Sequence, residues 1–155
     1  MINDELIKKT LENSKTIAMV GVSSFKKEVS TNIKRRPSTI VMKYMQEFGY
    51  KVIPVNPFSA GEMVHGEMIL AKLSDIKIPV DIVDVFRPSK ETPIIAEETI
   101  KIGAKVLWLQ YGIENAEAQK IAKEANMVYI SNRCIKQEYQ KLFLKTNPVF
   151  PALKN

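Results

Sequence analysis

Five short runs of apolar and β-branched residues recur along the chain and predict β-strands. The runs are TIAMV at 16–20, KVIPV at 51–55, DIVDVF at 81–86, KVLWL at 105–109 and MVYIS at 127–131. Apolar residues are nearly continuous within them, instead of alternating with polar ones. That pattern is typical of strands that helices cover on both faces of a parallel sheet.

Segments of helical length and period separate these runs. Helices are predicted over residues 4–13, 38–48, 89–102, 114–126 and 135–144. The second of them ends at Gly49 and the third at Gly103, because glycine readily takes the left-handed conformation that caps a helix. The remaining tail, 145–155, holds two prolines and is expected to be irregular.

Strand and helix alternate through one unit, which predicts an α/β fold: a Rossmann-like, doubly wound parallel sheet with helices on both faces. We expect one domain over 1–155, with a core of about 15–140 and an N-terminal helical segment at 1–14. The expected strand order is 3-2-1-4-5. A ligand crevice then opens at the carboxyl ends of the strands, where the winding reverses between the first and the fourth strand.

Composition narrows the class of protein. The chain has 155 residues and one cysteine, so it can form no internal disulfide, and the cytoplasm is the expected compartment. No run has the length of a signal peptide core or a membrane span. A net charge of +6 favours anionic partners. Apolar residues near the C-terminus leave either a monomer or a homodimer open.

The first loop of the predicted crevice follows the strand in IAMVGVSS. Gly21 permits a tight turn, and the N–H groups and hydroxyls of Val22, Ser23 and Ser24 can point at an anion. An ordinary turn is the alternative. The G-x-G-x-x-G pattern of dinucleotide sites is met at one glycine of three, and no phosphate-binding G-x-x-x-x-G-K-[ST] motif is present.

A basic stretch, FKKEVSTNIKRRPS at 25–38, precedes the second predicted helix. Positive side chains at the positive end of a helix dipole are unfavourable unless an anion shares the site. Arg36, Pro37 and Ser38 are therefore candidates for phosphate contacts. A solvated basic loop is the alternative.

The second strand ends in Val55, Asn56 and Pro57, without the acidic residue that holds a ribose in nicotinamide sites. The Val55 carbonyl and the Asn56 side chain could instead face a base or ribose, or form a simple turn. At the third strand end, Arg87 could pair with a phosphate and Phe86 could contact the ligand. The alternative is a surface arginine over a core phenylalanine.

Gln110 and Gly112 follow the fourth strand, and Asn132 and Cys134 follow the fifth, so these four residues are also candidates for binding a ligand in the crevice. Trp108 is interpreted as core. Cys134 is either a reactive thiol or a small buried residue. The single histidine, His65, has no evident partner for nucleophilic catalysis, and one His with one Cys makes no zinc site.

Asp84 lies inside an apolar run, so we expect it to hold neighbouring backbone or Arg87. No catalytic constellation emerges from the candidates, and this favours a binding module over an enzyme.

The ordered set IAMVGVSS, RPS, KVIPVNP, GEMVHGE, DIVDVFRPS, GAKVLWLQYGI and NRC resembles the small bacterial and archaeal CoA-binding proteins. That Rossmann-fold family is related to the N-terminal CoA-binding domain of succinyl-CoA ligase alpha subunits. The resemblance runs from about residue 15 to about 140. The ligase's phosphorylated histidine belongs to a later domain, and we expect no such domain in this chain.

The resemblance implies a coenzyme A site in the crevice. It places Gly21–Ser24 and Arg36–Ser38 near the phosphates, and Val55–Pro57 near the adenosine half. Non-catalytic binding of CoA or an acyl-CoA is the leading hypothesis. The alternative is an enzyme with a nucleotide cofactor, either an NAD(P)-dependent reductase or an acyl-CoA ligase-related activity. A nucleic-acid partner is not expected, since no RNA motif or DNA-reading helix is evident.

Overall fold

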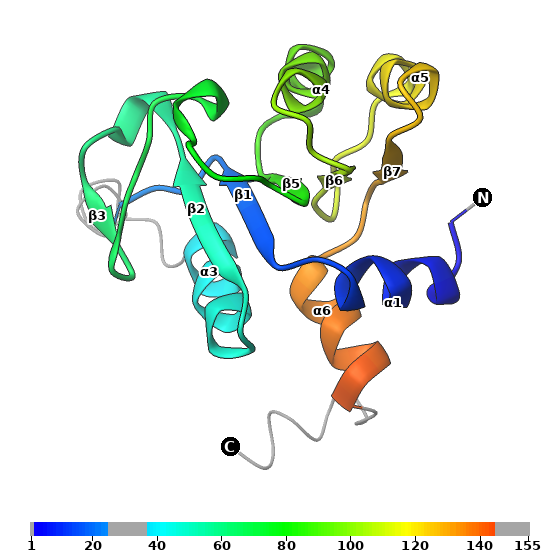
Figure 1. The fold of residues 1–155 in the computed structure, drawn as a ribbon, viewed down its shortest axis with the longest axis horizontal. Coiled ribbons are helices and arrows are strands. Elements are labelled where there is room, and N and C mark those ends of the chain that lie inside the picture. Colours follow the sequence, from blue (N-terminus) through cyan, green and yellow to red (C-terminus); the bar gives the residue numbers. More distant parts are fainter. Residues whose placement is uncertain (1, 25–36, 145–155) are drawn as a thin grey trace.

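The computed structural model describes residues 2–24 and 37–144, and it contains a parallel sheet of five strands (Figure 1). The strands are β1 (Thr16–Val20), β2 (Lys51–Val55), β5 (Ile82–Val85), β6 (Val106–Leu109) and β7 (Val128–Ile130). Each coincides with one of the five apolar runs. The predicted fold class, a doubly wound α/β sheet, is confirmed.

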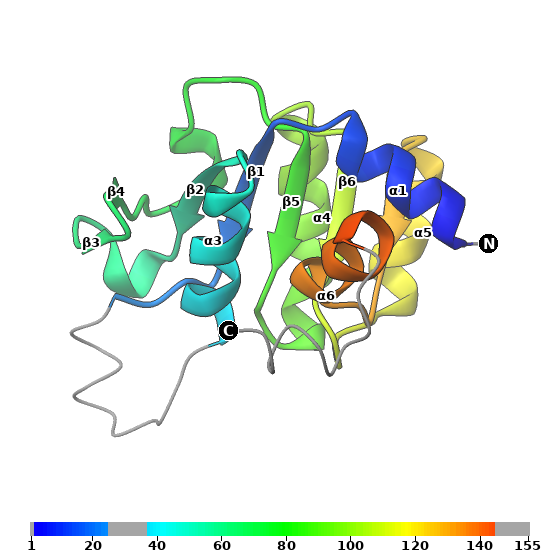
Figure 2. The same ribbon diagram turned by 90° about the horizontal axis from the view of Figure 1, so that it is seen from below.

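Helices cover both faces of this sheet (Figures 1 and 2). One face carries α1 (Asp4–Glu12), α3 (Pro37–Glu47) and α6 (Ile135–Tyr139), and a π-helical turn, Gln140–Leu144, extends the last. The other face carries α4 (Thr92–Lys101) and α5 (Ala116–Glu124). Asparagine caps explain two of the starts: Asn3 Oδ1 accepts from the Leu6 N–H and Asn115 Oδ1 from the Ala118 N–H, both at 2.9 Å.

The order of strands across the sheet is β2-β1-β5-β6-β7, which corrects the predicted 3-2-1-4-5 to 2-1-3-4-5. Pro54 supplies a physical reason, because proline has no N–H for a ladder and is confined to edge strands. The edge of β2 is paired by a returning segment after the hairpin of β3 (Met63–Val64) and β4 (Glu67–Met68). There the Leu70 N–H donates to the Pro54 carbonyl at 2.9 Å.

This order moves the point where the winding reverses. It lies between β1 and β5, not between the first and fourth strands as expected. Since β5 pairs directly with β1, the end of β5 comes beside the end of β1. Gly21 therefore lies against Phe86 and Arg87.

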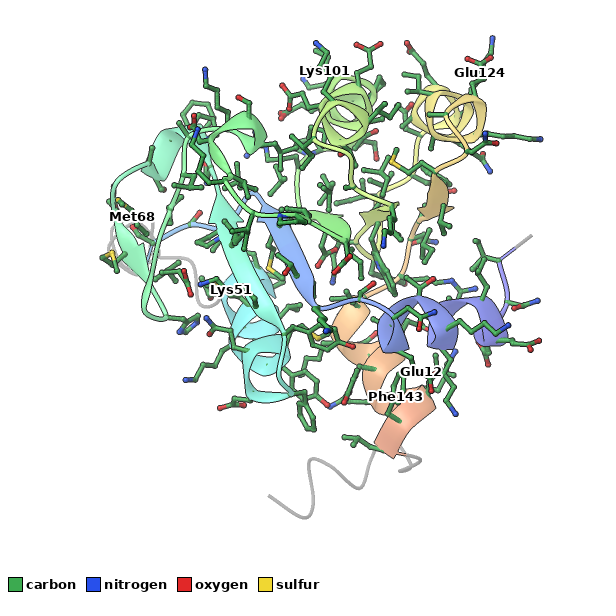
Figure 3. The ribbon with its side chains drawn as sticks, viewed as in Figure 1. Glu12, Lys51, Met68, Lys101, Glu124 and Phe143 are labelled. Atoms are coloured by element: carbon green, nitrogen blue, oxygen red, sulfur yellow. The ribbon has the colours of Figure 1, made fainter. Side chains whose placement is uncertain are left out.

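The core has two apolar layers because strand side chains alternate between the faces. Ile17 and Met19 pack in the layer under α1, α3 and α6, whereas Ala18 and Val20 pack in the layer under α4 and α5. Charged side chains such as Lys101 and Glu124 project outward from the helices (Figure 3). Burial on both faces explains why the strand sequences are almost entirely apolar.

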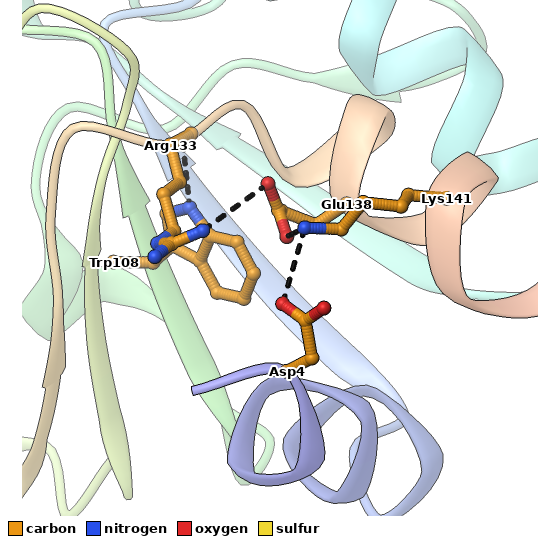
Figure 4. Close-up of polar contacts among 5 residues, drawn as sticks. All are labelled: Asp4, Trp108, Arg133, Glu138 and Lys141. Carbon is orange, nitrogen blue, oxygen red and sulfur yellow. Dashed lines mark hydrogen bonds and ion pairs between the residues drawn. The ribbon is translucent and has the colours of Figure 1, made fainter. Parts of the chain in front are cut away.

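Polar contacts fasten α6 to the sheet and to α1 (Figure 4). The indole Nε1–H of Trp108 donates to the Arg133 carbonyl at 2.8 Å. Lys141 Nζ lies 3.1 Å from both Asp4 Oδ1 and Glu138 Oε1. Trp108 is fully buried, so its interpretation as core is confirmed. Its hydrogen bond also fixes the segment that leads into Cys134.

Candidate functional site

Two hollows flank the sheet at the carboxyl ends of its central strands. The larger hollow, about 710 Å³, is lined by Pro37, Ile40, Val41, Phe86, Gln110, Tyr111, Ile113, Cys134, Lys136 and Gln137. The smaller hollow, about 420 Å³, is lined by Val20, Gly21, Val55, Pro57, Phe58, Ala71, Lys72, Leu73, Arg87, Glu91, Ile94, Ile95 and Glu98. The first lies between α3 and α6, and the second between the end of β2 and α4. Together they occupy the position where open α/β sheets bind ligands.

Gly21 lies at the closest approach of the strand ends. Its φ is +103°, a conformation that favours glycine, and its N–H donates to the Val55 carbonyl at 2.8 Å. A Cβ there would lie 3.2 Å from Arg87 Cδ and 3.3 Å from the Phe86 carbonyl carbon. No larger residue fits without displacing its neighbours, so the tight turn that the sequence predicts is required here.

Asn56 holds the first loop in place. Its side chain is buried, its amide Nδ2 donates to the Val22 carbonyl at 3.0 Å, and its Oδ1 accepts from the Phe58 N–H at 3.0 Å. The Val55 carbonyl already accepts from Gly21. The two groups expected to face a base or ribose are thus hydrogen-bonded within the protein, and in this structure they position the loop.

The loop itself is partly enclosed. Val22 and Ser24 are buried and Ser23 is half-buried. The Ser24 hydroxyl donates to the carboxylate of Glu62. Ser38 is buried in the first turn of α3, beside Pro37 at the larger hollow. Arg36 and the rest of the basic stretch 25–36 lie outside the described residues.

Arg87 stands at the smaller hollow with a carboxylate partner. Its Nε and Nη2 donate to the two carboxylate oxygens of Glu91, each at 2.9 Å. This hydrogen bond raises the pKa of Arg87 and lowers the pKa of Glu91. The Arg87 guanidinium lies 5.9 Å from the ring centre of Phe58, whose side chain is 69% exposed. The carboxylate of Glu91 therefore balances part of the positive charge of Arg87, and their hydrogen bonds hold the guanidinium at the rim of the smaller hollow.

Phe58 is a further candidate that the sequence reasoning missed. It follows Asn56 and Pro57 in a short 3-10 helix, Pro57–Ser59, and it lines the smaller hollow. An exposed aromatic ring beside an arginine offers a flat surface to a planar ligand group. The sequence feature that could have identified Phe58 is an aromatic residue directly after the Asn-Pro pair that ends a strand.

Gln110 brings a polar group into the larger hollow. The residue is 7% exposed, and among the described residues its Oε1 has no hydrogen-bond partner. A buried carbonyl oxygen without a donor is costly, so a ligand N–H would satisfy it. The nearby Gly112 N–H donates to Asn132 Oδ1 at 2.6 Å, which ties the loops after β6 and β7 together.

Cys134 is both buried, at 9% exposure, and part of the lining of the larger hollow. His65 lies elsewhere, on the hairpin of β3 and β4. Its Nε2 is 2.9 Å from the Thr39 carbonyl, so it packs the hairpin onto α3. Neither hollow includes His65 in its lining.

The structure corrects the expectation that Asp84 holds neighbouring backbone or Arg87. Asp84 is fully buried in β5, opposite Met19 and Trp108 in the neighbouring strands. Neither carboxylate oxygen has a hydrogen-bond partner in the described part of the chain, so it holds neither backbone nor Arg87. Burial raises its pKa well above the ordinary value. The alternation of side chains, not a polar role, places it in the core.

Half of the sixteen candidates line the two hollows. Pro37, Phe86, Gln110 and Cys134 line the larger one, and Gly21, Val55, Pro57 and Arg87 line the smaller one. The described linings do not include Val22, Ser23, Ser24, Ser38, Asn56, Gly112 or Asn132, and Arg36 lies outside the described residues. Across residues 2–24 and 37–144, no three His, Cys, Asp or Glu side chains gather as metal ligands do. None of the helices in that same part of the chain has the length and apolarity that crossing a bilayer requires.

Comparison with known proteins identifies the family of this chain. Residues 15–140 match the family described as CoA binding domain. The protein YneT of Bacillus subtilis is 41% identical over 130 residues, which cover 84% of this chain and 89% of YneT.

Two solved structures resemble this one over almost its whole length. A hypothetical protein from Pyrococcus horikoshii has 40% identity and a TM-score of 0.81, covering 91% of this chain and 92% of its own. A protein from Thermus thermophilus has 37% identity and a TM-score of 0.81, covering 92% of this chain and 100% of its own. Because the family match spans most of the sequence, the chain belongs to the CoA-binding domain family.

Proposed function

We propose that this protein binds coenzyme A, or an acyl-CoA, in the crevice at the carboxyl ends of the strands, and that it does so without catalysis. The observation that carries the proposal is the pair of hollows on either side of the contact between Gly21 and Phe86. CoA has two dissimilar arms joined by a pyrophosphate. Two hollows flanking a glycine turn suit a ligand of that shape.

The lining residues fit the parts of CoA. Phe58 and Arg87 at the smaller hollow offer an aromatic face and a cation to the adenosine phosphate half. Gln110 in the larger hollow offers an acceptor to an amide N–H of the pantetheine arm. The N–H groups of the loop Val22–Ser24 and of the first turn of α3 are available for the pyrophosphate. The chemically reactive group of bound CoA would be its own thiol.

The chemistry of the larger hollow supports binding over catalysis. Its described lining includes Cys134 and Lys136 but no His, Asp or Glu side chain. General acid–base catalysis on a bound acyl group needs a side chain that takes up and returns a proton, and the described lining provides neither an imidazole nor a carboxylate. The enzymatic alternative would be favoured if NAD(H) bound more tightly than CoA.

Titration calorimetry with CoA tests the proposal, and Arg87→Ala sharpens it. We expect Arg87→Ala to weaken CoA binding by about 10- to 100-fold, because a hydrogen bond to a charged group contributes about 1.5–3 kcal/mol.

Lys105→Ala is the matched control, since Lys105 is exposed and pairs with Asp81 at the amino end of the sheet, 3.9 Å away. It removes the same charge far from the crevice and should leave the affinity unchanged. No detectable heat at millimolar CoA, or equal losses in both variants, would contradict the proposal.

A further inference from the structure

We propose that Cys134 is a site of thiol–disulfide exchange, at which the thiol end of CoA becomes attached to the protein as a mixed disulfide. This inference rests on the proposed function and extends it from reversible binding to a redox-dependent covalent state. The reacting partner is a disulfide of CoA.

The position of Cys134 is fixed from both sides. Before it, the Trp108 indole donates to the Arg133 carbonyl at 2.8 Å (Figure 4). The Arg133 N–H also donates to the Leu109 carbonyl at 3.4 Å. After it, the Cys134 carbonyl accepts from the Glu138 N–H at 3.0 Å. The side chain lines the larger hollow while the residue as a whole is only 9% exposed. Such a thiol is reached through the hollow and little from elsewhere.

A second observation supports a ligand that donates a hydrogen bond inside this hollow. Gln110 lines the same hollow, is more than nine-tenths buried, and keeps Oε1 without a donor among the described residues. The pantetheine arm of CoA carries two secondary amides, each with one N–H to donate. An arm that satisfies Gln110 lies in the same space as Cys134.

The direction of the arm follows from which elements line the hollow. Pro37 and Ile40 of α3 line it on the side where the pyrophosphate is proposed to bind. Cys134 and Lys136, at the start of α6, line it on the other side. A ligand anchored by its phosphates near α3 therefore extends its thiol toward α6.

The exchange step balances without an added oxidant. Cys134 loses its proton and Sγ attacks one sulfur of CoA disulfide, forming a Cys134–CoA disulfide bond as the bond between the two CoA sulfurs breaks. The second CoA leaves as a thiolate and takes up the proton. One disulfide is consumed and one is formed.

Intact-protein mass spectrometry after incubation with CoA disulfide is the test. We expect one adduct, heavier by one CoA less two hydrogens, that a phosphine reductant removes. Cys134 is the only cysteine, so the adduct identifies the residue. Glutathione disulfide should react at least about tenfold more slowly, since only CoA gains the high effective concentration that a binding site provides.

Gln110→Leu separates recognition from mere thiol exposure. It should slow the reaction with CoA disulfide while leaving the reaction with glutathione disulfide as it was. The matched control is Gln119→Leu, the same substitution at an exposed position of α5. An adduct that forms equally fast with both disulfides, or a Gln110→Leu rate equal to that of the control, overturns the inference.

Calorimetry with reduced CoA in the presence of the phosphine keeps the two proposals apart. Binding of reduced CoA together with an unshifted mass after CoA disulfide overturns the role of Cys134 alone. Absence of binding overturns the proposed function as well.

Discussion

Gly21→Ala is expected to destabilise the protein by about 3 kcal/mol and to reduce CoA binding at least tenfold. The strained φ of +103° contributes about 1–3 kcal/mol for a residue with a side chain. The added Cβ would also press on Arg87 Cδ at 3.2 Å and on Phe86 Cβ at 3.3 Å, and overpacking of this kind costs about 1–3 kcal/mol. Urea unfolding followed by the fluorescence of the buried Trp108 measures the loss.

Gly49→Ala is the control that separates backbone strain from crowding. Its φ of +98° is close to that of Gly21, but a Cβ at this helix end meets nothing within 4 Å. We expect a loss of only about 1–2 kcal/mol, from the backbone conformation alone, and unchanged CoA affinity. Equal losses of unfolding free energy in the two variants would contradict our claim that the contact of Gly21 with the end of β5 adds to the cost of a side chain there.

Asp84→Asn is expected to make the protein more stable at pH 7 and to remove a pH dependence. Asp84 is fully buried without a hydrogen-bond partner in the described part of the chain, and this burial raises the pKa of its carboxyl. The folded state therefore retains a proton that the unfolded chain releases above about pH 3.9. An amide has a similar shape and does not ionise, so burying it does not require the folded state to keep a proton.

The sign of the pH dependence follows from proton binding. Where the folded state binds more protons than the unfolded state, stability falls as pH rises. The wild-type stability should therefore fall, relative to that of the Asn variant, by about 1.4 kcal/mol per pH unit above about pH 4 until the pKa of the folded state is passed. Denaturant unfolding of both proteins between pH 4 and pH 8 measures this difference.

Asp81→Asn, at the start of the same strand, is the matched control. Asp81 Oδ2 accepts from the Lys15 N–H at 2.7 Å and from the Thr16 N–H at 3.1 Å, so its carboxylate is well satisfied. We expect this variant to be less stable than the wild type at pH 7. A stabilising effect here, or parallel pH curves for wild type and Asp84→Asn, would contradict the account of Asp84.

The individual elements were readable in the sequence because their causes are local. Strand runs such as TIAMV are apolar throughout because both faces of the sheet are covered. Helix α3 ends where Gly49 can take a positive φ. Gly21 directly follows a strand and begins a turn. This position predicts both its positive φ and a crevice at the carboxyl end of that strand. The same local signals carry the resemblance to CoA-binding proteins.

The strand order 3-2-1-4-5 predicted from the sequence is wrong, although one residue pointed to the observed order. Pro54 marks β2 as an edge strand, which is incompatible with the interior place that the expected order gave it. What tertiary structure added is the pairing of β2 with the segment at Leu70 and of β1 with β5. Strand pairing depends on which distant segments meet in the folded chain. Because the apolar runs are similar in composition, their sequences do not specify which strand pairs with which.

The chain by itself therefore determined the elements, their alternation and the glycine turn, since periodicity and backbone preferences act over a few residues. Only the tertiary structure decided what each polar group does. It turned Asn56 inward to hold the loop and placed Cys134 on a hollow. It also left Gln110 Oε1 and both carboxylate oxygens of Asp84 buried without hydrogen-bond partners among the described residues. The physical reason is that burial and hydrogen bonding depend on side chains from remote segments, which come together only when the sheet forms.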